Sequence, residues 1–433
     1  MTTTTPTALP ITTIQPDFPA VLADVRAGAV PAEAIWVSCY KTGAPSVHAK
    51  ITAALDEVDR DAVRFDVSEG DVLLERSENG ATYTVSCPSL QVHKTPVITP
   101  TREFADPAHA PPRPPRRITA LAVAPDGTQF ACGYLDGAVR LSPTAPAPSS
   151  PHRNLPKTHL STVTTLAFFP SSRVLLSAGA DFALAVLPAD PSPSSDAAPP
   201  APVRVLKGHT RAITATAIIG RGRNVLSASA DGTLRLWDVG GGAQLRAIRA
   251  RGGITAIALG DGALTSAHTG AQDEREVGTE GVIVFCALQD GGWEALDLAL
   301  GTSLFRSAPS PSPLTAIAYS ATGRLATGSA RGVVSVYPTA ALTSTPTQIF
   351  ARNAAEITDL AFAPAGLVVG TDDGLPFIAA FGAGGEEGEE EGVRVRVRAE
   401  LVGSDCDAVR VVRVRGGEVW VAGDDGVVRV YEP

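Results

Sequence analysis

The chain has 433 residues, 44% of them hydrophobic, which suffices for one large core or two to three ordinary ones and excludes disorder of the whole chain. The formal net charge is −9, because 45 Asp and Glu residues outnumber 36 Lys and Arg residues. A net anionic surface repels nucleic acid and anionic lipid, so we expect no nucleic-acid or membrane partner and consider a basic protein partner a better fit.

The five cysteines are an odd number, lie far apart and never show a CxxC spacing, so the sequence predicts neither a disulfide framework nor a zinc site. They are Cys39, Cys87, Cys132, Cys286 and Cys406. We expect reduced thiols in a cytoplasmic and nuclear protein. Residues 1–20 lack the basic and apolar regions of a signal peptide, and no apolar stretch of about eighteen residues follows, so we expect a soluble chain.

The first hundred residues predict a small β-rich domain after a flexible start. Residues 1–30 are expected to be flexible, apart from a short helix at Phe18 to Arg26. Residues 31–100 contain four apolar runs and the turn signals Glu69-Gly70 and Asn79-Gly80, a pattern typical of strands. The runs are Ala34–Cys39, Val63–Val67, Val72–Leu74 and Thr82–Cys87. Proline density between Pro107 and Pro115 then indicates a linker over residues 101–116.

A repeat organises the remaining chain, residues 117–433. The pattern apolar-Thr-x-apolar-Ala-apolar occurs three times in full, and its alternation indicates β-strands. The full copies begin at Ile118, Val163 and Ile254, similar copies begin at Ile213, Leu314 and Ile357, and a degraded copy reads Val409-Arg410-Val411-Val412.

Each copy precedes a turn pair that leads into a second alternating run. The pairs are Asp136-Gly137, Asp181-Phe182, Asp231-Gly232, Glu280-Gly281, Arg331-Gly332, Asp373-Gly374 and Asp425-Gly426. Their mean spacing of about 48 residues is slightly above the roughly 40–45 residues of a four-stranded propeller blade. The sequence therefore predicts an all-β fold, a seven-bladed β-propeller with a small β-rich N-terminal domain.

The third copy is nearest to a complete WD repeat, with Gly208-His209 ahead of its first strand and Trp237-Asp238 ending its third. In WD repeats a buried His, Ser, Asp and Trp hydrogen-bond across the strands. The residues that match this structural tetrad are His209, Ser227 or Ser229, Asp231 and Trp237. His159 offers the same role in the second copy, whereas the other copies depart from the tetrad.

Closure of the ring requires a strand from upstream. The chain ends at Val430-Tyr431-Glu432-Pro433, directly after a third strand, so the last blade lacks its fourth. Closing a propeller removes its exposed strand edges. We expect the segment Leu90 to Ile98 to supply the missing strand and to pair beside Val427 to Tyr431.

The sequence offers little for catalysis. It contains no GxSxG, HExxH or GxxxxGK[ST] motif and no GxGxxG after a strand, and its seven histidines are scattered without metal spacing. We therefore predict no catalytic residue, no metal and no cofactor, and a structural role for His209. A propeller without an active site is typically a rigid platform whose loops bind protein, and we expect a monomer.

Three segments in order resemble one particular WD-repeat family. They are Gly222 to Val225 in the third repeat, Arg275 to Glu280 within an insertion from Ser266 to Thr279 in the fourth, and Gly403 to Asp407 before the last. With Trp36 to Cys39 and Ser86 to Pro88, they are similar to the proteasomal ATPase-associated factors. The resemblance covers roughly Ala34 to Tyr431. It implies a chaperone of proteasome regulatory-particle assembly that binds the C-terminal domain of an ATPase subunit.

The candidate protein-binding residues lie in two of these segments, where loop acids suit a basic patch on a partner. They are Asp273, Glu274, Arg275, Glu276, Glu280, Asp405 and Asp407. The alternative for Arg275 to Glu280 is a solvated loop in which Glu280-Gly281 only turns the chain. Two other functions stay open: a WD-repeat substrate receptor of a ubiquitin ligase, and a hydrolase with a site in the central channel.

Overall fold

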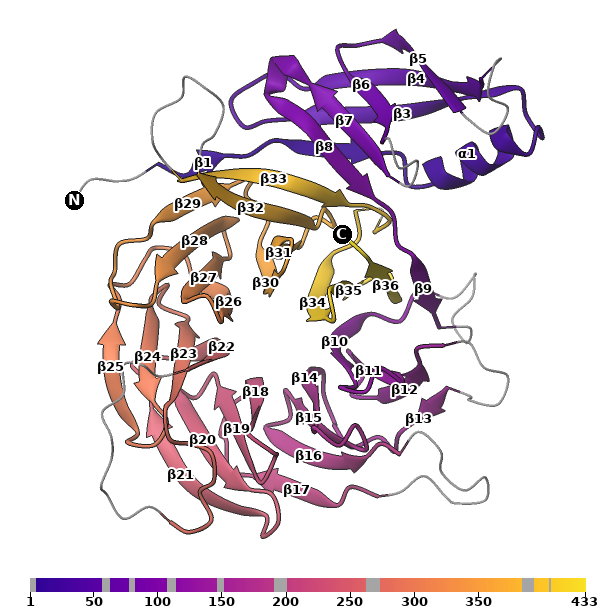
Figure 1. The fold of residues 1–433 in the computed structure, drawn as a ribbon. Coiled ribbons are helices and arrows are strands. Elements are labelled where there is room, and N and C mark those ends of the chain that lie inside the picture. The colour runs from indigo at the N-terminus through magenta and orange to yellow at the C-terminus, as the bar shows by residue number, and fades with distance from the viewer. Residues whose placement is uncertain are drawn as a thin grey trace.

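The computed structural model describes residues 5–56, 63–77, 82–106, 114–145, 152–190, 201–261, 273–383, 393–404 and 406–433. Seven antiparallel four-stranded blades surround a central axis (Figure 1), and N-terminal strands extend two of the blades at their outer edges. The innermost strands contact one another in a closed ring from blade 1 to blade 7. The predicted fold class, an all-β seven-bladed propeller with a small β-rich N-terminal domain, is confirmed.

Each blade runs from an inner to an outer strand. The inner strands are β10 (Ile118–Val123), β14 (Val163–Phe168), β18 (Ile213–Ile219), β22 (Ile254–Asp261), β26 (Leu314–Ser320), β30 (Ile357–Ala363) and β34 (Val409–Arg415). The second strands are β11 (Gln129–Tyr134), β15 (Val174–Gly179), β19 (Asn224–Ser229), β23 (Val282–Leu288), β27 (Arg324–Ser329), β31 (Gly366–Thr371) and β35 (Glu418–Gly423).

The third strands are β12 (Val139–Pro143), β16 (Ala183–Pro188), β20 (Thr233–Asp238), β24 (Trp293–Asp297), β28 (Val333–Pro338), β32 (Phe377–Ala383) and β36 (Val427–Tyr431). The outer strands are β13 (Arg153–Asn154), β17 (Arg204–Lys207), β21 (Ala243–Arg249), β25 (Thr302–Arg306), β29 (Gln348–Ala351), β33 (Val393–Leu401) and, in blade 7, β9 (Arg102–Ala105).

The threonine of the repeat lies at a β-bulge. In every blade the pairing register between the inner and second strands shifts at the second residue of the inner strand. In blades 1, 3, 5 and 6 the hydroxyl of that threonine donates to the first carbonyl of the next inner strand, for example from Thr119 to Val163 at 2.7 Å and from Thr315 to Ile357 at 2.6 Å. In blade 2, Thr164 donates to Ala178 O of its own blade at 3.1 Å. Because the strand beginnings meet in this way, the inner strands run in the same direction.

This common direction gives the propeller two distinct faces. The leading face carries the connections into each inner strand, such as residues 208–212, and the turns between second and third strands, such as residues 230–232. The trailing face carries the connections from inner to second strands, such as residues 220–223, and from third to outer strands. A loop of one kind therefore lies on the same face in all seven blades.

One predicted turn is wrong. In blade 4 the turn between second and third strands is at Asp290-Gly291, where Gly291 N donates to Leu288 O at 3.1 Å. Glu280-Gly281 instead ends the connection 262–281 between β22 and β23, on the trailing face. This connection is the longest between an inner and a second strand in the ring. Its extra residues placed Glu280-Gly281 at the spacing expected of the turn between the second and third strands.

The N-terminal domain is built on a sheet with the order β2-β3-β4-β5. Its strands are β2 (Ile11–Ile14), β3 (Ala32–Tyr40), β4 (Val47–Leu55) and β5 (Val63–Glu69), and helix α1 (Phe18–Arg26) contacts β3, β4 and β5. Phe18 and Val25 of the helix are fully buried in the core of the domain. The helix is confirmed, but the prediction of a flexible start is wrong for residues 5–30, because these residues contribute buried side chains.

A second layer joins this domain to the propeller. It contains β6 (Leu73–Arg76), β7 (Tyr83–Cys87), the 3-10 turn η1 (Pro88–Leu90) and β8 (Val92–Ile98). The end of β8 pairs in parallel with β33, so this layer continues the sheet of blade 6 (Figure 1). Farther upstream, β1 (Thr7–Ala8) pairs in parallel with β29 of blade 5.

The ring is closed by β9 and not by Leu90 to Ile98, which corrects both the predicted closing strand and the predicted linker. β9 pairs antiparallel with β36, with Phe104 opposite Val428. Val92 and Val97 of β8 are instead buried in the N-terminal core, which holds that strand beside blade 6. The charged residues Arg102 and Glu103 obscured β9 in the sequence; they form ion pairs with Glu418 and Arg429 of blade 7.

We expect Phe104→Ala to lower the free energy of unfolding by about 2–3 kcal/mol, somewhat less than for a fully buried phenylalanine, because Phe104 is partly exposed. Its ring lies 4.9 Å from that of Phe130 and 6.0 Å from that of Trp420, so it joins blades 1 and 7. Urea unfolding measures the change, with Phe104→Leu as the milder control. A loss below about 1 kcal/mol would contradict this closure.

Candidate protein-binding surface

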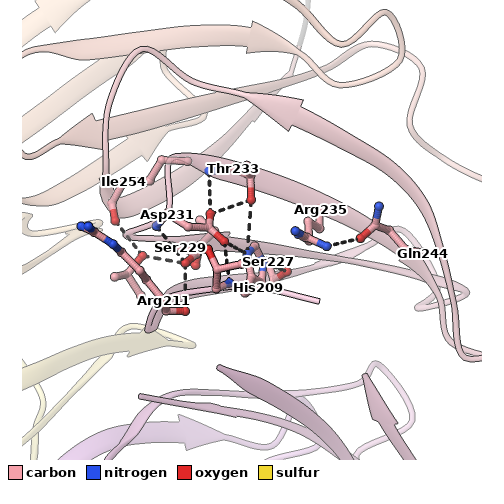
Figure 2. A network of polar contacts seen from close by, with 12 residues as sticks. His209, Arg211, Ser227, Ser229, Asp231, Thr233, Arg235, Gln244 and Ile254 are labelled. Atoms are coloured by element: carbon pink, nitrogen blue, oxygen red, sulfur yellow. Dashed lines mark hydrogen bonds and ion pairs between the residues drawn. The ribbon is translucent and has the colours of Figure 1, made fainter. Parts of the chain in front are cut away.

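The tetrad residues of blade 3 form one chain of hydrogen bonds. Trp237 Nε1 donates to Ser227 Oγ at 2.9 Å, and Ser227 Oγ lies 2.8 Å from His209 Nε2. His209 Nδ1 lies 2.9 Å from Asp231 Oδ2 (Figure 2). Of the two candidate serines, Ser227 is therefore the one in contact with His209, whereas Ser229 Oγ donates to the Arg211 carbonyl at 3.1 Å.

The chemistry of the two ends fixes the direction of this chain. An indole nitrogen can only donate a hydrogen bond, and a carboxylate can only accept one. Ser227 therefore donates to His209 Nε2, and the Nδ1–H group of a neutral His209 donates to Asp231. Burial lowers the pKa of His209, which is only partly opposed by Asp231. Burial opposes ionisation of Asp231, but bonds from Thr233, the Thr210 amide and His209 outweigh it and lower the pKa of that carboxyl.

Blade 2 has the same network without tryptophan. His159 lies 2.9 Å from Ser177 Oγ and 3.0 Å from Asp181 Oδ1, and Leu187 occupies the strand position that corresponds to Trp237. His159 and His209 are both buried, with His209 6% exposed, and each has protein partners on both ring nitrogens. These histidines therefore stabilise blades and are not placed to meet a substrate.

The end of the blade 4 connection is attached to blade 3. Asn224, fully buried at the start of β19, donates to the Arg275 carbonyl at 3.1 Å and accepts from the Val277 amide at 2.7 Å. Arg246 of β21 forms a two-pronged ion pair with Glu276, with contacts of 3.0 and 2.9 Å. These contacts fix residues 275–277 on the trailing face beside blade 3.

The candidate charges therefore differ in what they can offer a partner. The Glu276 carboxylate is 3% exposed and pairs with Arg246, so the structure places this predicted binding residue as an anchor of the loop. Asp273 and Arg275 are exposed and pair at 2.6 Å, and hydrogen bonds from Arg275 lower the pKa of Asp273 to about 2. Glu274 and Glu280 are exposed as well.

The structure does not bring the two predicted acidic segments together. Asp407 precedes the inner strand β34 and so lies on the leading face, where its amide donates to Ser404 O at 2.9 Å. Residues 273–280 follow the inner strand β22 and lie on the trailing face. Asp405 lies outside the described residues. Asp407 and Glu274 therefore occupy opposite faces, and the two candidate segments do not form one surface.

Asn224 and Arg246 hold the loop, but nothing in the local sequence marks them for this role. Asn224 stood out only as part of Gly222 to Val225, a segment noted for its resemblance, and Arg246 is one of two arginines in β21. Their partners are 30 to 53 residues away in the sequence, so no local pattern could show the contact.

Within the described parts of the chain, no cluster of three His, Cys, Asp or Glu side chains could hold a metal ion.

Comparison with known proteins supports the class of protein. A family model described as WD domain, G-beta repeat, matches residues 107–141, 150–186 and 200–238, which are segments of blades 1, 2 and 3. No curated protein matches the chain. In the described residues, no helix is long and apolar enough to cross a membrane.

The fold and these matches define a WD-repeat β-propeller. WD-repeat proteins are generally non-catalytic scaffolds for protein interaction, and no catalytic family is indicated for this chain. The matches coincide with the blades that hold the hydrogen-bonded histidines, together with blade 1.

We expect the stability of the fold to fall as the pH drops below about 6.5, the ordinary pKa of histidine. The folded pKa of His209 is lowered, so its contribution is complete above the unfolded pKa and is lost as the pH falls toward the folded value. Thermal unfolding between about pH 7 and 5 measures this. His209→Gln should reduce the pH dependence, and the exposed control His93→Gln should keep it; an unchanged profile in the first variant would contradict the assignment.

We also expect Asn224→Ala to lower the free energy of unfolding by about 2–3 kcal/mol, because it leaves the Val277 amide and the Arg275 carbonyl without their partner. Hydrogen exchange at the Val277 amide should become faster. Glu274→Ala, an exposed change in the same loop, is the control and should leave this exchange rate as it is. An equal rate of hydrogen exchange at the Val277 amide in the Asn224 variant and the parent chain would show that Asn224 does not hold the loop.

Proposed function

We propose that this WD-repeat scaffold is a chaperone of proteasome regulatory-particle assembly, which binds the C-terminal domain of a base ATPase subunit in the cytoplasm and nucleus. The proposal rests first on the resemblance to the proteasomal ATPase-associated factors. Two of the segments that carry this resemblance, Gly222 to Val225 and Arg275 to Glu280, are joined by the two hydrogen bonds of the Asn224 side chain. The likeness therefore extends over residues that form one structural unit.

The N-terminal segments of the resemblance form a second unit. Cys39 in β3 and Cys87 at the end of β7 are both fully buried in the same core and interact with each other. Burial raises the pKa of the Cys39 thiol to about 12, so it stays protonated and serves as a small apolar residue. These buried contacts support a structural role for the N-terminal segments of the resemblance.

The observation that carries the proposal is the fixed loop on the trailing face. The loop exposes Asp273, Glu274 and Glu280, and Val277 beside them is half exposed. Since Asn224 holds the backbone at Arg275 and Val277 and Arg246 holds the Glu276 side chain, residues 275–277 have little conformational entropy left to lose when a partner binds. An exposed, preorganised and acidic loop on a chain with a net charge of −9 suits a basic patch on the partner.

The test compares charge reversal on the two faces. Glu274→Lys combined with Glu280→Lys should weaken binding of a purified ATPase C-terminal domain about tenfold at low salt, since single exposed charges contribute only about 0–1 kcal/mol. Surface plasmon resonance over a salt series measures the affinity and the association rate, which should respond most below about 0.1 M salt. Asp407→Lys, on the leading face, is the matched control.

Two results would contradict the proposal. One is unchanged affinity of the folded double variant for every ATPase domain tested, and the other is a larger effect of Asp407→Lys. Affinity purification of the chain with mass spectrometry then separates the alternatives: recovery of ATPase subunits supports the chaperone role, whereas recovery of ligase adaptors supports a ubiquitin-ligase receptor. Melting temperatures verify that each variant is folded.

A further inference from the structure

The turns of the leading face obey a strict rule in six blades. In each, the second position of the turn between second and third strands is a glycine with φ between 73° and 84°. A Cβ atom there would come within 3.2 Å of the backbone of the connection into the next blade. These residues are Gly137, Gly232, Gly291, Gly332, Gly374 and Gly426. Glycine is favoured both by the left-handed backbone and by the close approach.

Blade 2 breaks this rule with a large apolar residue. Phe182 occupies the same position with a φ of 69°, in the region that bulky residues avoid, and its side chain is 43% exposed. The strained backbone costs stability, and the half-exposed ring recovers only part of that cost by burial. A strained residue that is kept exposed on a surface points to a role in binding.

Two further exposed apolar residues adjoin this turn. Leu160, in the connection into blade 2, is 90% exposed, and Leu135, in the corresponding turn of blade 1, is 53% exposed. The Leu160 amide donates to Asp181 at 2.9 Å, and Thr162 Oγ1 donates to the Leu135 carbonyl at 3.2 Å. These bonds link the three successive loops, so all three residues lie on neighbouring loops of the leading face. We call Leu135, Leu160 and Phe182 the leading-face apolar patch.

The charges around this patch are positive, although the chain as a whole is negative. Arg117, Lys157 and Arg211 are exposed in the connections into blades 1, 2 and 3. The nearby acids are already occupied: Asp136 pairs with Arg116 at 2.8 Å, and Asp181 is bound by His159. A basic rim around an apolar centre attracts a segment of the opposite charge and repels a basic one.

We infer that the leading-face apolar patch binds a peptide segment of a partner protein in which apolar side chains are flanked by Asp or Glu. The apolar residues would cover Leu135, Leu160 and Phe182, and the acidic flanks would meet Arg117, Lys157 and Arg211. This surface lies on the face opposite the acidic loop of residues 273–280 and has the opposite charge. The inference therefore stands apart from the proposed ATPase partner and does not depend on it.

The probe is a synthetic amphipathic peptide of about 16 residues, with Leu and Phe on one face of a helix and Glu on the other. Its matched control has Lys at every Glu position. Fluorescence anisotropy with the full chain should give micromolar binding of the acidic peptide, at least tenfold weaker binding of the basic one, and a loss of affinity as salt is added. Absence of binding by the acidic peptide, or equal binding of the two peptides, would overturn the inference.

The variants separate binding from folding. Phe182→Gly restores the residue type of the other six turns, so its melting temperature should equal or exceed that of the parent chain while its affinity falls at least fivefold. Leu160→Ser should lower the affinity to a similar degree. Leu300→Ser removes a side chain that is 49% exposed on the trailing face, and it should leave binding unchanged. Parental affinity in both Phe182→Gly and Leu160→Ser would overturn the inference.

Discussion

The hydrogen bond from a bulge threonine to the next blade recurs at four of the seven blade junctions, and it is the repeated interaction that ties neighbouring blades together. A β-bulge leaves one residue without a partner in its own sheet and turns it away from the regular ladder. Here that residue is the threonine of the repeat, and Thr119, Thr214, Thr315 and Thr358 each use it to reach the carbonyl that begins the next inner strand. Neighbouring blades are thereby held in register as well as in contact.

Among the described residues, blades 2, 4 and 7 lack this bond, and in blade 7 an ion-pair bridge links the neighbouring blades instead. Arg410 takes the position of the threonine, and its guanidinium bridges Asp424 of its own blade at 2.8 Å and Asp372 of blade 6 at 2.7 Å. The bond between neighbours is kept, but its direction is reversed toward the preceding blade. Closure toward blade 1 uses β9, whose Phe104 stacks on Trp420, and the buried ion pair of Asp106 with Arg140. Arg415 of blade 7 adds hydrogen bonds to the carbonyls of Ala124 and Pro125 in blade 1.

The start of the chain is attached to the ring by a buried ion pair. Arg352 and Glu400, from blades 5 and 6, lie 2.5 Å apart, and they also bind the Pro10 carbonyl and the Thr12 amide. Burial raises the pKa of Glu400, against the opposing effect of Arg352. Desolvation of two charges offsets most of their attraction, so the pair orients the N-terminal segment more than it stabilises it.

What the sequence could predict follows from the range of each signal. The bulge threonine, the turn glycines and the tetrad recur in local patterns, so the seven blades and the contacts of His209 could be anticipated. β9 could not be anticipated, because its alternating pattern is short and two of its four residues are charged. These two residues form ion pairs with residues more than 300 positions away in the sequence. For the same reason Glu276 resembled an exposed acid: its arginine lies in another blade.

The departures from the repeat are also where the two faces acquire different properties. A propeller needs only short connections and glycine turns to fold, so the connection 262–281 and Phe182 are not required by the architecture. The first adds an acidic loop on the trailing face that Asn224 and Arg246 hold in place. The second adds an apolar side chain within a basic rim on the leading face. Faces of opposite charge cannot favour the same partner surface. A scaffold of this form is therefore suited to binding two chemically different segments, one on each face, with the blades between them.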